Sequence, residues 1–276
     1  MNLLSFSAVS AIEEEKDLQS VNISFEYFKY SDDTKALKAK LFYREGRSFI
    51  SVVGEEISFY ASDDNGEVYL APITTDENGE AYLLISQDYI MPEISPGTTI
   101  YKAIYNGSEK LAEVEEELII SDLILDFELT EIDSVKTIEV SVSTLDDEGT
   151  IIPVEDAEIY VYAKRLYSNL TIGEDWSNED GYISVEFPDN LPGDSEGNVT
   201  IIVQIPESDE YGTVEKTDNI NWGIPVSFET ADQPRALWSD EAPLWMVIGM
   251  FVVLLGAWIN FGLAVYYVSR IKKTKN

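Results

Sequence analysis

The chain has 276 residues, of which 52 are acidic and 18 are basic, and it contains neither cysteine nor histidine. Without these two residue types it cannot form disulfides, Ser-His-Asp or Cys-His triads, or the usual zinc sites. A formal net charge of −34 repels nucleic acid, so we expect no DNA or RNA partner. Composition therefore favours a protein that is not an enzyme.

The chain begins with a short segment whose role stays open. Residues 1–17 contain a brief apolar run but lack the positively charged start that is typical of a signal peptide. We interpret them as a disordered N-terminus or as the remnant of a signal sequence. Either way, they are not expected to be part of the fold.

An internal repeat with an offset of 102 residues covers most of the chain. Three blocks match in order at this offset: residues 22–27 with 124–129, 52–60 with 154–162, and 76–85 with 178–187. Between the first two, the alternating apolar residues at 37–41 match those at 138–142 after a slip of one residue. Blocks that match in order indicate a duplication. We predict two domains, residues 18–121 and 122–228.

Within each copy, apolar and polar residues alternate, which is typical of strands with one buried face. Asn78-Gly79 and Asp180-Gly181 separate such segments, and these dipeptides favour tight hairpins with positive φ. Six to eight short strands in about 100 residues predict a β-sandwich. The predicted fold class is all-β, with two tandem Ig-like β-sandwiches followed by one C-terminal transmembrane helix.

The duplication also predicts that corresponding positions share an environment. Three pairs are expected to be buried in both copies: Phe25 and Phe127, Ile57 and Ile159, and Leu83 and Val185.

The second copy carries the motif that links the chain to known modules. Its strand at 154–162, its Asn178-Glu179-Asp180-Gly181 turn and the alternating residues at 182–187 together resemble bacterial Ig-like domains of the invasin class. The same layout is similar to carboxypeptidase-regulatory-like sandwiches. The resemblance covers residues 18–228 and rests on a short motif that is common in secreted β-domains. It implies binding, spacing or display rather than catalysis.

Turns that are rich in oxygen donors indicate one candidate metal cofactor, calcium. Asp76, Asn78 and Glu80 have the alternate spacing of a loop site, and Ca²⁺ prefers oxygen ligands. The glycine and the final glutamate that complete an EF-hand are absent, so a plain turn on an acidic surface explains the same residues. Calcium binding at these three residues is the only cofactor hypothesis.

Two tryptophans lie in the second copy. Trp222 lies next to the end of a strand, where we expect it in the core. Trp176 lies in a predicted loop and is either a core side chain or an interface anchor.

Residues 244–268 contain no formal charge and are followed by four basic residues, Arg270, Lys272, Lys273 and Lys275. About 20 apolar residues suffice to cross a bilayer, so this segment is a predicted transmembrane helix. A stalk at 229–243 precedes it and a basic tail at 269–276 follows. The positive-inside rule places the tail in the cytoplasm and the domains outside.

One polar residue, Asn260, lies inside the predicted span. Gly256 and Ala264 share its helix face at a spacing of four residues. Small residues permit close helix approach, and an amide can hydrogen-bond across helices. We predict that this face contacts another transmembrane helix, from a second copy or from another subunit.

These features lead to three hypotheses. An exported domain without disulfides indicates a bacterial or archaeal cell, with the chain in the cytoplasmic membrane and its domains in the periplasm or outside. The leading hypothesis is a non-enzymatic, membrane-anchored binding or structural protein. The alternative is an accessory subunit of a larger respiratory or transport complex, recruited through the helix. The third is a calcium-dependent adhesion module.

Overall fold

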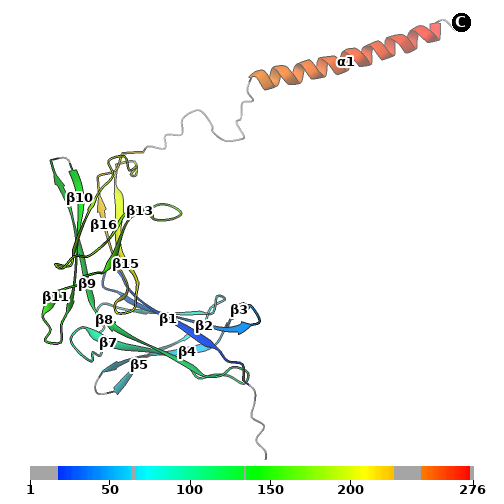
Figure 1. Cartoon of the computed structure of the whole chain (residues 1–276). Coiled ribbons are helices and arrows are strands. Elements are labelled where there is room, and N and C mark those ends of the chain that lie inside the picture. Colours follow the sequence, from blue (N-terminus) through cyan, green and yellow to red (C-terminus); the bar gives the residue numbers. More distant parts are fainter. Residues whose placement is uncertain (1–17, 64–65, 134, 227–243, 274–276) are drawn as a thin grey trace, which may run out of the picture. The chain divides into compact units, whose positions relative to one another are not determined.

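The computed structural model describes residues 18–63, 66–133, 135–226 and 244–273. It divides into a β-rich unit that ends at Val226 and a second unit that holds one helix (Figure 1). The predicted fold class, strands followed by a single C-terminal apolar helix, is confirmed. The N-terminal segment at 1–17 and the predicted stalk at 229–243 lie outside the described residues.

The β unit consists of two copies with the same strands. In the described residues the first copy comprises β1 (Asn22–Lys29), β2 (Lys35–Glu45), β3 (Ser48–Ser51), β4 (Glu56–Asp63), β5 (Gly66–Thr74), β6 (Glu80–Ile85), β7 (Thr98–Tyr105) and β8 (Val114–Ser121). The second comprises β9 (Leu123–Ile132), β10 (Val135–Leu145), β11 (Ile151–Pro153), β12 (Glu158–Ala163), β13 (Leu170–Trp176), β14 (Tyr182–Glu186), β15 (Val199–Ser208) and β16 (Gly212–Ile220).

The strand pairings of the first copy recur in the second. Strand β2 pairs with β1, β3 and β6, as β10 pairs with β9, β11 and β14. In the other sheet β5, β4, β7 and β8 lie in that order, as do β13, β12, β15 and β16. All of these pairs are antiparallel. The duplication read from the sequence is therefore present in the topology.

Each copy encloses its own hydrophobic core between two sheets. In the first copy Phe25 from β1 and Phe59 from β4 bring their rings to 6.0 Å. In the second, Ile138, Ile159 and Ile201 are fully buried on strands of both sheets. A core that two facing sheets build together defines a β-sandwich.

The predicted core pairs are buried to different degrees. Ile57 and Ile159 are fully buried in both copies. Phe25 and Val185 are also buried, whereas their counterparts Phe127 and Leu83 are half-buried and pack against the cores.

A side-chain cap stabilises the turn that follows β5 and the turn that follows β13. Asp76 accepts hydrogen bonds from the backbone N–H groups two and four residues ahead, at 2.8 and 2.9 Å. Asn178 does the same in the second copy, at 3.0 Å for both. The chain was expected to form hairpins here, and that expectation was wrong, because each turn connects strands of different sheets.

The glycines of these turns are required by the crossing. Gly79 and Gly181 have φ values of 76° and 69°. A Cβ atom on Gly79 would lie 2.8 Å from the Leu41 carbonyl oxygen, and one on Gly181 would lie 2.3 Å from that of Val142. Each turn therefore folds directly onto the central strand of the opposite sheet, which a larger residue would prevent.

A buried hydroxyl lies one residue before each turn. Thr75 Oγ1 donates to the Val52 carbonyl at 2.8 Å, and Ser177 Oγ donates to the Val154 carbonyl at 2.7 Å. Each oxygen also accepts the backbone N–H three residues beyond that carbonyl, at 3.1 and 2.9 Å. One side chain thus satisfies two buried backbone groups in both copies.

The C-terminal helix α1 spans Leu244–Lys273, so it extends beyond the predicted 244–268 into the first basic residues of the tail. Its segment Leu244–Tyr267 is long and apolar enough to cross a membrane. A soluble core helix would bury such side chains, but none of this segment is buried. The helix therefore has the length and surface of a single membrane span.

Candidate functional site: the junction between the two copies

The two copies meet with almost no linker. Strand β8 ends at Ser121 and β9 begins at Leu123, so Asp122 alone separates them. Strand β1 of the first copy also pairs in parallel with β16 of the second, through Phe28 opposite Thr213 and the next residue of each strand. We call the region around Lys29 and Asp122 the junction.

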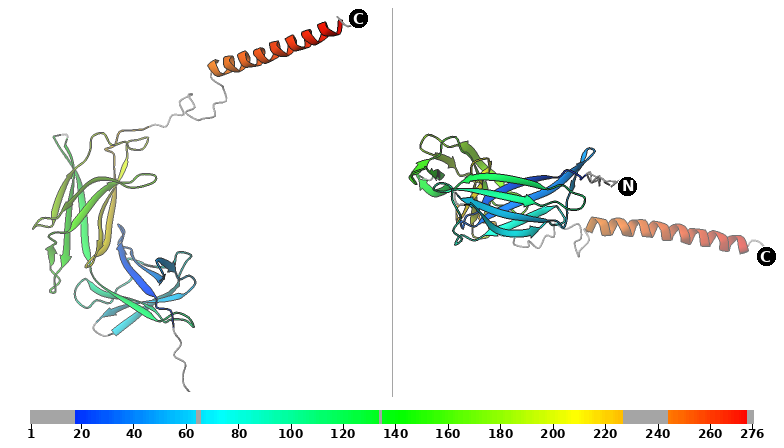
Figure 2. Two further views of the ribbon diagram at one scale, coloured as in Figure 1. Left: turned by 45° about the vertical axis from the view of Figure 1, so that its right-hand side comes forward. Right: turned by 90° about the horizontal axis from the view of Figure 1, so that it is seen from below.

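This parallel pair merges one sheet of each copy into a single eight-stranded sheet. Its order is β13-β12-β15-β16-β1-β2-β3, with β6 also paired to β2. Figure 2 (left) shows the end of the blue strand β1 beside the yellow strand β16. The copies therefore share backbone hydrogen bonds in addition to side-chain contacts.

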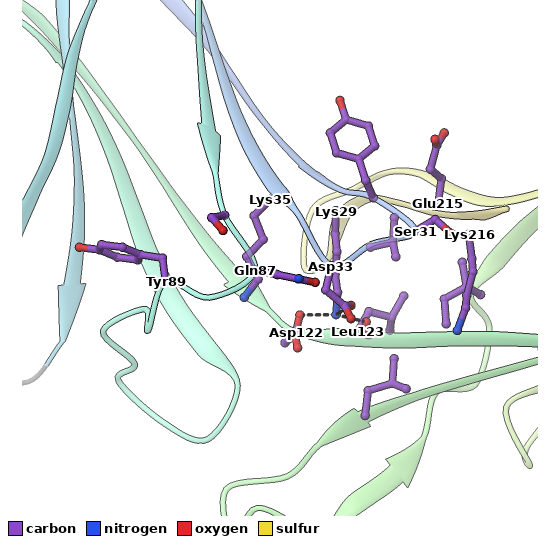
Figure 3. A pocket seen from close by; sticks show the side chains of 15 residues that line it. Lys29, Ser31, Asp33, Lys35, Gln87, Tyr89, Asp122, Leu123, Glu215 and Lys216 are labelled. Atoms are coloured by element: carbon purple, nitrogen blue, oxygen red, sulfur yellow. Dashed lines mark hydrogen bonds and ion pairs between the residues drawn. The ribbon is translucent and has the colours of Figure 1, made fainter.

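A buried lysine lies at the centre of the junction. Lys29 Nζ donates to Asp122 Oδ1 at 2.8 Å and to the Leu123 carbonyl at 3.0 Å (Figure 3). Asp33 Oδ1 lies 3.7 Å away on the same copy as the lysine. Only 8% of Lys29 is exposed, and a buried ammonium needs such partners to offset its lost hydration. The lysine joins the first copy to the linker residue and to the first residue of the second copy.

Backbone groups around Asp122 are held by both copies. The Asp122 N–H donates to the Gly97 carbonyl at 2.7 Å, and its own carbonyl accepts from Thr144 Oγ1 at 3.1 Å. The preceding Ser121 N–H donates to the Glu210 carbonyl at 2.9 Å. The linker is thus fixed on both sides and is poorly suited to act as a hinge.

Two further contacts bring β1 and β16 together. Ser31 Oγ accepts the Thr217 N–H at 3.0 Å and donates to the Thr217 carbonyl at 3.3 Å. Gly212 has a φ of 67°, and a Cβ atom there would lie 2.6 Å from the ring of Tyr27. The glycine therefore allows β16 to start directly against the first copy.

A groove of about 430 Å³ opens at the junction and is lined by both copies. Figure 3 shows Lys35 and Gln87 on one side of Lys29, with Glu215 and Lys216 on the other. Its charged lining residues balance in number: Lys29, Lys35, Lys216, Asp33, Asp122 and Glu215. The ammonium group of Lys29 is already engaged by Asp122 and by the Leu123 carbonyl.

Two tyrosines pack next to the junction. Tyr27 and Tyr101 stack with ring centroids 5.4 Å apart in the first core. Burial raises the pKa of both phenols well above the usual range, so they stay protonated. They fill space at the end of the sandwich that carries Lys29.

The predicted calcium residues are engaged in their turn. Backbone N–H groups of Glu80 and then Asn78 donate to Asp76 and lower the pKa of its carboxyl group. In the described part of the chain, no three metal-ligating acidic side chains lie together. Calcium binding at Asp76, Asn78 and Glu80 stays a prediction, which melting with and without calcium tests.

The two tryptophans of the second copy lie in different environments. Trp222 is half-buried against the core, with its ring 5.4 Å from that of Phe187. Trp176 is the last residue of β13 instead of part of a loop, and 57% of it is exposed because β13 is an edge strand. An interface role for Trp176 stays a prediction.

In α1 the Asn260 side chain is bonded within its own helix. Its Nδ2 donates to the Gly256 carbonyl at 2.9 Å. This bond uses one donor of the amide. Contact of the Gly256, Asn260 and Ala264 face with another helix stays a prediction.

Sequence reasoning missed the Lys29 junction, although a signal was present. Val21 just before β1 and then Ile23, Phe25 and Tyr27 within it alternate inward, and the next inward position is Lys29. A lysine in phase with core residues requires buried carboxylate or carbonyl partners. The identity of those partners depends on the pairing of β1 with β16.

No family model and no curated protein matches this chain. Among solved structures it is similar to a tetra-tandem repeat from the extending region of a large adhesion protein. That match has 12% identity and a TM-score of 0.26, and covers 72% of this chain and 48% of that one.

Two other solved structures are similar to a comparable degree. The D0-D1 domain of intimin is 13% identical with a TM-score of 0.23, over 71% of this chain and 96% of that one. A β-glucuronidase of Parabacteroides merdae is 12% identical with a TM-score of 0.23, over 72% and 25%.

Proposed function

We propose that this chain is a non-enzymatic, single-pass membrane protein that presents two Ig-like β-sandwiches as one rigid body outside the cytoplasm. The observation that carries this proposal is the junction. A spacer or display module needs a fixed geometry between its domains, and a shared sheet with a buried Lys29–Asp122 pair supplies one.

Composition supports a structural or binding role, because the chain has no histidine or cysteine to act as a general base or nucleophile. The exposed surface of the sandwiches is then the part that contacts other molecules.

Orientation in the membrane follows from charge. All 52 acidic residues precede α1, while Arg270, Lys272, Lys273 and Lys275 lie at its end or beyond. Translocation of the acidic part and retention of the basic end obey the positive-inside rule. We place the β unit in the periplasm or at the cell exterior of a prokaryote, with the C-terminus in the cytoplasm.

Because the chain has no cysteine, single-cysteine labelling tests this topology without background. Ile90→Cys places a thiol at a side chain that is 92% exposed in the β unit, and Lys275→Cys places one in the tail. In intact cells a membrane-impermeant maleimide should label position 90 only, and after lysis it should label both. Labelling of position 275 alone in intact cells would overturn the proposal.

The helix supports a second candidate, an accessory subunit that joins a larger membrane complex. A plain anchor has no use for an amide in its span, and one donor of Asn260 is bonded to Gly256. Its remaining polar atoms are then available for a neighbouring helix.

Co-purification in mild detergent separates the two candidates. Asn260→Leu and Gly256→Ile should preserve insertion and remove an associated subunit, the first by deleting a hydrogen bond and the second by steric exclusion. Leu254→Ile is the matched control outside this face. An unchanged set of associated proteins in all three variants would leave the passive anchor as the better account.

A further inference from the structure

The loop between β12 and β13 exposes large apolar side chains at its tip. Within residues 164–169, Leu166 is 87% exposed and Tyr167 is 95% exposed. Lys164 is also exposed, and its side chain makes no hydrogen bond or ion pair within the described residues. Soluble surfaces seldom present adjacent Leu and Tyr side chains this fully without a binding function.

The first copy lacks this feature at the corresponding position. At an offset of 102 residues, Arg165-Leu166-Tyr167-Ser168 aligns with Asp63-Asp64-Asn65-Gly66. The second copy thus has basic and apolar residues where the first has acidic and turn-forming residues. Lys164-Arg165 is also the only adjacent pair of basic residues ahead of α1. The fold alone does not require this composition, because both copies share the same strands.

The loop lies at the end of the second sandwich from which the chain leaves the β unit. Strand register aligns Ala163, the last residue of β12, with Ile201 of β15, and Ile201 with Asp218 near the end of β16. Arg165 Nη1 donates to the Pro192 carbonyl at 2.7 Å. Pro192 in turn forms a bridge with Ile224, two residues before the unit ends at Val226.

We propose that the tip of this loop, Leu166 and Tyr167, inserts into the interfacial region of a lipid bilayer. The inference rests on the proposed function, because the bilayer is the one that α1 spans. Tyr rings favour the boundary between headgroups and acyl chains, and a lysine beside them can reach lipid phosphates. Arg165 does not face the lipid, because it holds the base of the loop.

A lipid surface fits this loop better than another partner does. Two side chains form a contact too small for a stable protein interface, which buries about 800 Å² on each partner. Residues 227–243 connect Val226 to Leu244, and 17 residues extend at most about 60 Å. A contact tethered over that length needs little intrinsic affinity, because its effective concentration reaches the millimolar range. The acidic remainder of the β unit would confine the contact to this loop.

A fluorescent label beside the tip tests the proposal in the full chain. Ser168→Cys labelled with NBD leaves Leu166 and Tyr167 intact, and Ile90→Cys is the matched control. Ile90 is 92% exposed and lies in the loop between β6 and β7 of the first copy. Each labelled protein is reconstituted at low density in phosphatidylcholine vesicles, with or without nitroxide-labelled lipid.

The label at position 168 should be quenched by nitroxide lipid at least twofold more than the label at position 90. A Leu166→Ser/Tyr167→Ser variant with the same label should fall to the level of the control. Equal quenching at positions 168 and 90 would overturn the inference. A fluorescence change at position 168 that rises with protein density, and not with the amount of nitroxide lipid, would also overturn it. A second copy of the chain would then cover the loop. Loss of the whole chain from the vesicles would instead refute the membrane anchor.

Discussion

The two copies share the side chains that satisfy their backbones and differ in the side chains that they present outward. Thr75 corresponds to Ser177 and Asp76 to Asn178, and each pair makes the same hydrogen bonds with a different residue. In contrast, residues 63–66 of the first copy are acidic and turn-forming, whereas the corresponding residues 165–168 are basic, apolar and polar. Backbone satisfaction therefore restricts the fold more tightly than residue identity does, and surface loops are free to diverge.

The junction shows the same divergence in a more specific form. The position in β9 that corresponds to Lys29 is Glu131, and the position that corresponds to Asp122 is Ser20. Glu131 and Ser20 cannot form the ion pair that Lys29 and Asp122 form. The contact is therefore specific to this one pair of copies, which argues against open-ended chains of copies joined in the same way.

Edge strands differ in how they avoid unwanted pairing. Strand β5 contains Pro72, which cannot donate a hydrogen bond to a new strand. The corresponding residue in β13 is Glu174, whose charge serves the same purpose. Both edges are protected, by different chemistry.

The largest expected effect comes from the glycines of the crossing turns. Gly181→Ala should lower the free energy of unfolding by about 3 kcal/mol and Gly79→Ala by about 2 kcal/mol, because positive φ is strained in both and the clash at 181 is closer. Urea denaturation of the full chain in mild detergent measures both. Gly46→Ala, with positive φ but open space around the new methyl group, is the control. An order reversed between 181 and 79 would contradict the described geometry.

The next effect concerns the buried hydroxyls. Ser177→Ala and Thr75→Val should each cost about 1–3 kcal/mol, because a carbonyl and an N–H are left buried without a partner. Thr75→Ser and Ser177→Thr keep the hydroxyl and should cost less than half as much. If Thr75→Ser and Ser177→Thr cost as much stability as the two deletions, side-chain packing and not hydrogen bonding explains the effect of these residues.

The smallest effect is a difference in pH dependence between the two caps. The lowered pKa of Asp76 means that its stabilising contribution is complete above about pH 4, the unfolded value, and is lost as the pH falls through the lower folded value. Asp76→Asn should leave stability at pH 7 nearly unchanged, since Asn178 caps equally, and should flatten its decline below pH 4. Chemical denaturation at pH 7 and pH 3 tests this. An equal loss of stability between these two pH values in both proteins would contradict the role given to the Asp76 carboxylate.

Local patterns predicted most of the fold. Alternation along Ile138, Val140 and Val142 identified a strand with one buried face, and the 102-residue offset identified the duplication. The junction could not be predicted, because it depends on a parallel contact between β1 and β16 that are far apart in sequence. The turns at Gly79 and Gly181 were expected to be hairpins because Asn-Gly and Asp-Gly favour positive φ. These dipeptides do not indicate which sheet the next strand joins, so the crossing between sheets could not be predicted.

The distance between the two copies tests the central claim, that they form one rigid body through Lys29, most directly. Spin labels at Glu56→Cys in β4 and Ser184→Cys in β14 lie on exposed strand positions of different copies. Pulsed electron–electron double resonance on the full chain should give one narrow distance distribution. Lys29→Met, which leaves Asp122 unpaired, should broaden it, while Lys38→Met on the open sheet face should not. A broad or multiple distribution in the unaltered chain, or a narrow one that survives Lys29→Met, would contradict the account.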